Sequence, residues 1–258
     1  MVPLIAGSFM AGSPAERPSA TAGGAEGATP LAGRRSRAGA EAARYGVLRR
    51  LAPALKHDMV VNLQAIAMMA EVLNARLERG SPAPAEFQAS ISKLNRLARD
   101  AVANCLKVAS WIEPGEDEGV RLAQGVEDCI SLLASNFNFR GFVVTTQVPE
   151  SSFQVSRVVL RNLLVASLIV LTDAAQGPCE VHVKAEVIAG SAEISVRISP
   201  RQDEFEGLPF EPSYRQLDWA DVQALALAEQ VELVRANDQI VMRIPRAVAT
   251  APLKIAPV

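Results

Sequence analysis

The sequence predicts an α+β protein in which a long helical hairpin comes before an α/β sandwich. Over residues 41–79 and 85–112, apolar side chains recur at steps of three and four, the period of a helix with one buried face. Beyond residue 120 the period changes, and alternating segments typical of strands are mixed with helical ones. Hydrophobic residues make up 49% of the 258 residues, which is enough to form a buried core.

The first long helix is predicted over residues 41–79. Gly80 follows as a C-cap, and Pro82 and Pro84 prevent the helix from continuing. The apolar stripe of this helix consists of Leu48, Leu51, Leu55, Met59, Leu63, Ile66, Ala70, Leu73 and Leu77.

A second helix is predicted over residues 85–112. Two long helices joined by a short loop lie antiparallel. A single hairpin covers the apolar seam of each helix only in part, whereas a four-helix bundle of two hairpins covers both seams. Burial alone therefore predicts a homodimer. The stripe of the second helix consists of Phe87, Ile91, Leu94, Ala98, Ala101, Cys105, Val108 and Ile112.

The second half of the chain is predicted to form the sandwich. An acidic segment with Pro and Gly at residues 113–119 marks the boundary. Asp218 is a plausible N-cap for the last helix. The expected elements are a short strand and a helix over 120–139, a strand over 142–148, a buried helix over 156–175, a hairpin of strands over 179–188 and 192–199, a helix over 218–233 and a strand over 239–244.

The chain therefore divides into five predicted parts. Residues 1–40 are rich in Ala, Gly, Ser and Pro and have no helical or strand period, so we expect a disordered tail. The other parts are the hairpin over 41–112, the linker over 113–119, the sandwich domain over 120–247 and a tail over 248–258.

Composition excludes several functions. A formal charge of -2 and 5% aromatic residues argue against a nucleic-acid-binding protein. Three cysteines at no metal spacing and two histidines exclude a zinc cluster within one chain, so we expect no metal of the protein's own. No apolar run approaches the roughly 20 residues that span a bilayer. We expect a cytoplasmic protein that is not bound to a membrane.

His57 is the candidate reactive residue. It lies two residues after Leu55, so it points away from the apolar stripe of its helix. Its face also carries Val61, Gln64 and Met68. The other histidine, His182, lies within an alternating strand pattern and is expected to be an ordinary surface residue.

Residues 55–66 resemble the H-box of two-component histidine kinases. In that family, a histidine is followed by an acidic residue and, six places on, by a leucine. Asn62 stands where the family usually has proline. Val61 stands where Thr or Asn often supports phosphatase activity. The residues that match are His57, Asp58, Leu63, Ala65 and Ile66.

This resemblance implies roles for the residues around His57. An imidazole nitrogen of His57 would accept a phosphoryl group. Asp58 would accept a hydrogen bond from the other ring nitrogen or from an incoming group. Lys56 would offset phosphate charge. The receiver domain of a response regulator would dock on the exposed faces beside His57, through Val61, Gln64 and Met68.

The sandwich domain also resembles the ATP-binding domain of that family. Residues 159–167 are similar to its N-box helix, and Asn162 matches the first asparagine of that motif. Ala166 stands where a second asparagine holds Mg²⁺, and it has no oxygen ligand. Residues 200–207 lack the Asp and paired Gly that bind adenine. We expect a fold kept without nucleotide binding.

The leading hypothesis is a histidine phosphotransferase that carries phosphate on His57 between receiver-domain aspartates. Its expected partners are response-regulator receivers, the receiver of an upstream hybrid kinase and a second copy of the chain. It would hydrolyse no ATP and need no cofactor of its own, because the receiver supplies Mg²⁺. Two alternatives stay open. One is a non-catalytic pseudokinase scaffold, and the other is an atypical ATP-dependent histidine kinase with Asn162 as its candidate Mg²⁺ ligand.

Overall fold

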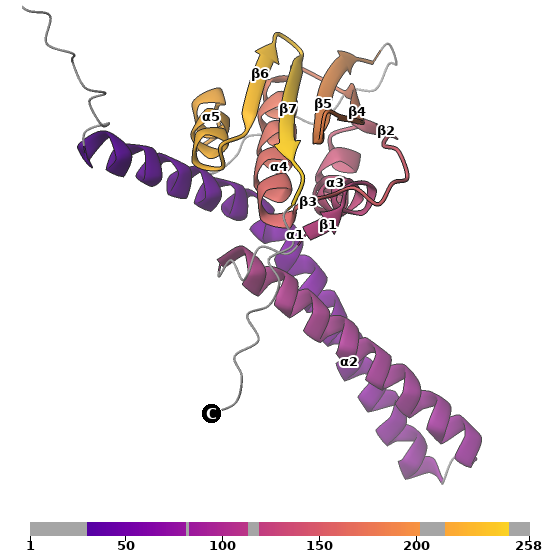
Figure 1. The fold of residues 1–258 in the computed structure, drawn as a ribbon. Coiled ribbons are helices and arrows are strands. Elements are labelled where there is room, and N and C mark those ends of the chain that lie inside the picture. Colours follow the sequence, from indigo (N-terminus) through magenta and orange to yellow (C-terminus); the bar gives the residue numbers. More distant parts are fainter. Residues whose placement is uncertain (1–29, 81–82, 113–118, 202–214, 248–258) are drawn as a thin grey trace, which may run out of the picture.

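A computed structural model describes residues 30–80, 83–112, 119–201 and 215–247. Two long helices form an extended arm, and the remaining elements gather at one end of it (Figure 1). In chain order, the elements are α1 (Pro30–Arg79), α2 (Pro84–Ile112), β1 (Gly119–Arg121), α3 (Leu122–Phe139), β2 (Val143–Gln147), β3 (Gln154–Ser156), α4 (Arg157–Ala174), β4 (Cys179–Ile188), β5 (Ser191–Pro200), α5 (Trp219–Ala228), β6 (Glu232–Ala236) and β7 (Gln239–Pro245).

The main sheet is mixed. Its five strands lie in the order β2-β4-β5-β7-β6. β2 runs parallel to β4, and the other pairs are antiparallel. A second, two-stranded sheet pairs β1 with β3. The chain is therefore α+β, as the sequence predicts.

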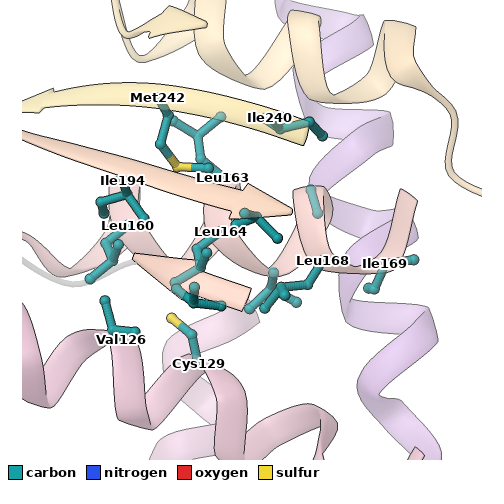
Figure 2. Close-up of a cluster of buried hydrophobic side chains, with 14 of the residues drawn as sticks. Val126, Cys129, Leu160, Leu163, Leu164, Leu168, Ile169, Ile194, Ile240 and Met242 are labelled. Atoms are coloured by element: carbon teal, nitrogen blue, oxygen red, sulfur yellow. The ribbon is translucent and has the colours of Figure 1, made fainter. Parts of the chain in front are cut away.

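Helices cover one face of the main sheet, and the core lies between the two layers (Figure 1). Most of α4 is buried between Leu160 and Thr172, which fits the apolar residues that it carries on more than one face. Leucines of α4 lie between α3 and the strands, opposite Ile194 and Met242 (Figure 2). The strands present alternate residues to this core: Val181, Val183, Ala185, Ala192, Ile194, Val196, Ile240, Met242 and Ile244.

Several boundaries predicted from the sequence are confirmed. The helix predicted over 156–175 is α4, and the hairpin predicted over 179–199 is formed by β4 and β5. Asp218 caps α5: its side chain accepts from the amide of Asp221, and the Asp221 carboxylate accepts from the amide of Asp218.

The helix predicted over 218–233 is wrong in its second half. α5 ends at Ala228, and the chain then enters strand β6. Gln230 has a φ of 54°, a left-handed conformation that ends the helix. Asn237 and Asp238 then form the two-residue turn between β6 and β7. β3, a strand of three residues, has no expected counterpart in the sequence pattern.

The first helix begins earlier than predicted. Residues 30–40 were assigned to the disordered tail, but α1 starts at Pro30. Ala40 and Ala43 pack closely against the rest of the protein and are only 1% and 0% exposed. Tertiary burial at Ala40 and Ala43 therefore anchors the end of a segment whose composition gives no helical signal. The predictions for residues 1–29, 113–118 and 248–258 lie outside the described residues.

The two halves of α1 contact different parts of the protein. Residues 40–55 pack on the α/β domain, beside α3, α4 and α5, and residues 56–79 pair with α2 (Figure 1). The predicted division placed residues 41–55 in the hairpin, whereas their buried side chains belong to the core of the α/β domain. Pro53 lies inside α1 near this change of partner and removes one helical hydrogen bond. No helix in the described ranges is long and apolar enough to span a bilayer.

Candidate functional site

His57 lies just beyond the point where α1 leaves the α/β domain. Leu55 is the last buried residue of α1 and is 6% exposed. His57 follows two residues later on an exposed face. Because a helix turns about 100° per residue, the two side chains point in nearly opposite directions. The imidazole is therefore held on a rigid helix and is open to a partner.

Three of the predicted docking residues share the face of His57. From the helical repeat, Val61, Gln64 and Met68 lie within about 40° of His57 around the axis of α1. Val61 is 45% exposed and Met68 is 63% exposed, and Gln64 is also exposed. The structure therefore brings a nucleophilic nitrogen and an apolar surface of two side chains together on one face.

Asp58 and Lys56 lie on either side of this face, each about 100° from His57 around the helix. Neighbouring residues on a helix do not face each other. In the described part of the chain, neither His57 nor Asp58 takes part in a side-chain hydrogen bond or an ion pair. The Asp58 carboxylate therefore points to a separate part of the surface, accessible to an incoming group.

Asn162 and Ala166 lie on α4, inside the α/β domain. Asn162 is 4% exposed and Ala166 is 0% exposed. The structure thus buries the one residue of the N-box pattern that retains an oxygen ligand. Ala166 places a methyl group where the related motif has its second amide.

The first half of α1 is attached to the α/β domain by ion pairs as well as by apolar contacts. Arg50 of α1 lies 3.0 Å from the carboxylate of Asp173, at the end of α4. Arg140 lies 2.6 Å from the same carboxylate and donates to the carbonyl of Thr172. Arg44 lies 2.6 Å from Glu229, directly after α5. α1 is therefore anchored to both α4 and α5.

A second anchor joins the end of the hairpin to the α/β domain. Arg161 of α4 donates to both the hydroxyl and the carbonyl of Ser110, near the end of α2. Its guanidinium also lies 4.0 Å from the ring centroid of Trp111, a cation–π contact. Both ends of the hairpin are therefore fastened to the same domain.

The other histidine, His182, lies in the main sheet. His182 is half-buried in the sheet, with its ring nitrogens 2.7 Å from the Thr145 hydroxyl and 3.2 Å from that of Ser199. No group of three or more His, Cys, Asp and Glu side chains in the described ranges is placed to hold a metal ion.

Sequence reasoning missed both anchors. The available signals were charged residues in apolar surroundings: Arg161 interrupts an apolar helix, and Asp173 follows one. A buried charge requires a partner, so each of these residues implies an opposite charge or a polar group nearby. The sequence did not identify Arg50 or Ser110 as those partners.

Comparisons with known proteins give alignments to solved structures. No protein-family model matches the sequence, and no curated protein matches it. The histidine kinase AdeS of Acinetobacter baumannii aligns at 14% identity and a TM-score of 0.39, over 71% of this chain and 96% of that chain. A histidine kinase from Burkholderia phymatum aligns at 15% identity and a TM-score of 0.38, over 85% of this chain and 99% of that chain. A bacterial phosphotransferase aligns at 16% identity and a TM-score of 0.34, over 76% of this chain and 95% of that chain.

Proposed function

We propose that this chain is a histidine phosphotransferase of a two-component phosphorelay, which carries a phosphoryl group on His57 between receiver-domain aspartates. The observation that carries the proposal is the placement of His57 on an exposed helix face beside Val61, Gln64 and Met68. A reactive nitrogen at the edge of an apolar surface suits transfer between two docked proteins.

The transfer step needs only a neutral imidazole and a docked acyl phosphate. The lone pair of an unprotonated ring nitrogen of His57 attacks phosphorus. The bond between phosphorus and the aspartate oxygen breaks, the aspartate leaves as a carboxylate, and a nitrogen–phosphorus bond forms. The reverse step returns the phosphoryl group to a second aspartate. The receiver supplies Mg²⁺, Lys56 offsets phosphate charge, and Asp58 accepts a hydrogen bond from the incoming protein.

The α/β domain supports a phosphate source outside the chain. Ala166 has no oxygen for Mg²⁺, and Asn162 is buried within α4. The ion pairs of Arg50 and Arg44 hold α1 against α4 and α5. A domain attached at both ends of the hairpin has little freedom to bring a nucleotide to His57. We therefore favour the phosphotransferase over an ATP-dependent kinase.

The proposal includes a homodimer. On the second half of α1, exposed apolar residues recur at steps of three, four or seven, on a face about 60 to 160° around the helix from His57. Leu63 is 54% exposed in the single chain. A second copy would cover this stripe and leave His57 accessible. The stripe consists of Val60, Leu63, Ala67, Ala70 and Leu77.

The test is phosphate transfer from a phosphorylated receiver domain to the purified full chain. We expect label on the wild type, no label on His57→Ala, and wild-type labelling of His182→Ala. His182→Ala is the matched control, because it removes the other histidine, 34% exposed in the α/β domain. A parallel reaction with ATP alone should give no label.

The docking face is tested with a second pair of variants. Met68→Glu should slow transfer by at least about tenfold, because it places a charge in an apolar contact. Val187→Glu, at the exposed end of β4, should leave transfer unchanged. Label from ATP would favour the atypical kinase. Partner binding without transfer, unaffected by His57→Ala, would favour the scaffold.

A further inference from the structure

A cavity separates the end of the hairpin from the α/β domain. Its volume is about 480 Å³, within the range of small-molecule sites. α2, α3, α4 and β1 each contribute to its wall, so it lies at the junction of the two parts of the protein. Apolar side chains form most of the wall: Ala103, Leu106, Val120, Leu132 and Leu160.

The polar groups of the cavity carry more positive than negative charge. Arg157 and Arg161 line it, with Asp128 as the carboxylate. Asp128 lies 3.7 Å from Arg157, and the two side chains are 45% and 47% exposed, so the pairing is loose. Arg157 is also the first residue of α4, an 18-residue helix whose N-terminal end favours anions.

Arg161 is the second cation of the wall, and it is partly buried. Burial lowers the pKa of its guanidinium, and in the described residues its closest partners, Ser110 and the Trp111 ring, are uncharged. A cation without a carboxylate partner beside an apolar cavity is stabilised by a nearby negative charge.

We propose that this cavity binds a small organic anion with an apolar or aromatic body. The anionic group would lie at the rim beside Arg157, and the body would contact Leu106, Leu132 and Leu160. A bound molecule would touch both α2 and α4. It would therefore stabilise the junction between the hairpin that carries His57 and the α/β domain, beside the Arg161 contact.

The experiment compares two fluorescent probes on the full chain. 8-Anilinonaphthalene-1-sulfonate is an aromatic anion, and N-phenyl-1-naphthylamine has the same ring body without the sulfonate. The chain has 2 Trp, so Trp219→Phe leaves Trp111 as the only donor for energy transfer to a bound probe. We expect saturable transfer from Trp111 to the sulfonate probe, with a dissociation constant at least about tenfold below that of the neutral probe.

Three further variants locate the site. Ala103→Phe fills the cavity from an exposed helix position and should weaken both probes by at least about tenfold. Ala89→Phe is the matched control. Ala89 lies on nearly the same face of α2, about 21 Å along the helix from Ala103, so this change should leave the affinity for both probes unchanged. Arg157→Gln should weaken the sulfonate probe about three- to tenfold and leave the neutral probe unchanged.

Two results would overturn the proposal. One is equal binding of the sulfonate probe by wild type and Ala103→Phe, which would place the probe elsewhere, such as on the exposed stripe of the hairpin. The other is equal affinity for the charged and neutral probes. Circular dichroism and the melting temperature check that each variant folds. Leu106→Asn, at a residue that is 65% exposed, provides a second cavity variant if Ala103→Phe does not fold.

Discussion

The two halves of α1 have the same helical period but different surroundings. Leu51 in the first half is 1% exposed, whereas Leu63 in the second half is 54% exposed. The first half is covered by the chain's own α/β domain, and in the described part of the chain the second half pairs with α2. This difference means that an apolar stripe identifies a face that is able to be buried, but not the surface that buries it.

The same difference describes the position of His57, the candidate reactive residue. His57 lies directly after the last buried turn of α1, so the backbone that carries it is held by the α/β domain. The helix beyond His57 is exposed to other proteins. A partner or a second copy of the chain would therefore contact the second half of α1 without disturbing the first half. Four pairs of variants test this division.

The largest effect is expected at the ion pairs that hold the first half. Asp173→Asn leaves Arg50 and Arg140 facing a neutral amide, with all three side chains more than nine-tenths buried. We expect a loss of about 3–5 kcal/mol in the free energy of unfolding, measured by urea denaturation. Glu186→Gln breaks an exposed pair with Lys184 and should cost less than about 1 kcal/mol. Equal losses in the two variants would contradict the anchoring role of Asp173.

The next effect compares equivalent leucines in the two halves. Leu51→Ala should lower the free energy of unfolding by about 2–5 kcal/mol at every protein concentration, because it leaves a cavity in the core. Leu63→Ala should cost less than about 1 kcal/mol when the protein is dilute. Urea titrations at nanomolar and micromolar protein separate the two cases. If Leu51→Ala cost no more than Leu63→Ala, α1 would not pack on the α/β domain as described.

The third effect concerns the uncovered stripe. Leu63→Glu should weaken dimerisation by at least about tenfold, or ~1.4 kcal/mol, because a carboxylate would be buried between two copies. Sedimentation equilibrium measures the dissociation constant. Leu227→Glu is the control, because Leu227 is also exposed (68%) but lies on α5 of the α/β domain. A wild type that is monomeric at all concentrations would remove the dimer from the proposed function.

The smallest effect reports how closely α1 approaches the α/β domain. At Gly39, an added Cβ would lie 3.6 Å from the side chain of Ala224, an ordinary contact; at Gly46, it would lie 2.8 Å from Leu217. Gly39→Ala should stabilise the protein by about 0.5–1 kcal/mol, the usual gain for alanine in a helix. Gly46→Ala should gain less, because Leu217 must move. Thermal melts of both variants measure the difference, and equal gains would mean a looser contact at Gly46.

Much of the fold was predictable from local patterns. Alternation identified β4 and β5, the apolar run identified α4, and Asp218 identified the start of α5, because each of these signals acts within a few residues. The errors arose where distant residues decide. Residues 30–40 have no helical signal of their own. The helical pattern of α5 runs on into residues 229–233, although the chain leaves the helix at Gln230, whose φ is positive, and then forms β6.

The sequence alone determined that His57 stands on an exposed helix face, together with Val61, Gln64 and Met68, because helical spacing fixes which side chains share a face. Only the tertiary structure decided that residues 40–55 belong to the core of the α/β domain, and that Arg50, Arg44 and Arg161 fasten the hairpin to it. The physical reason is that helical spacing determines the direction in which a side chain points, whereas burial and ion pairing depend on which distant residues contact that side chain.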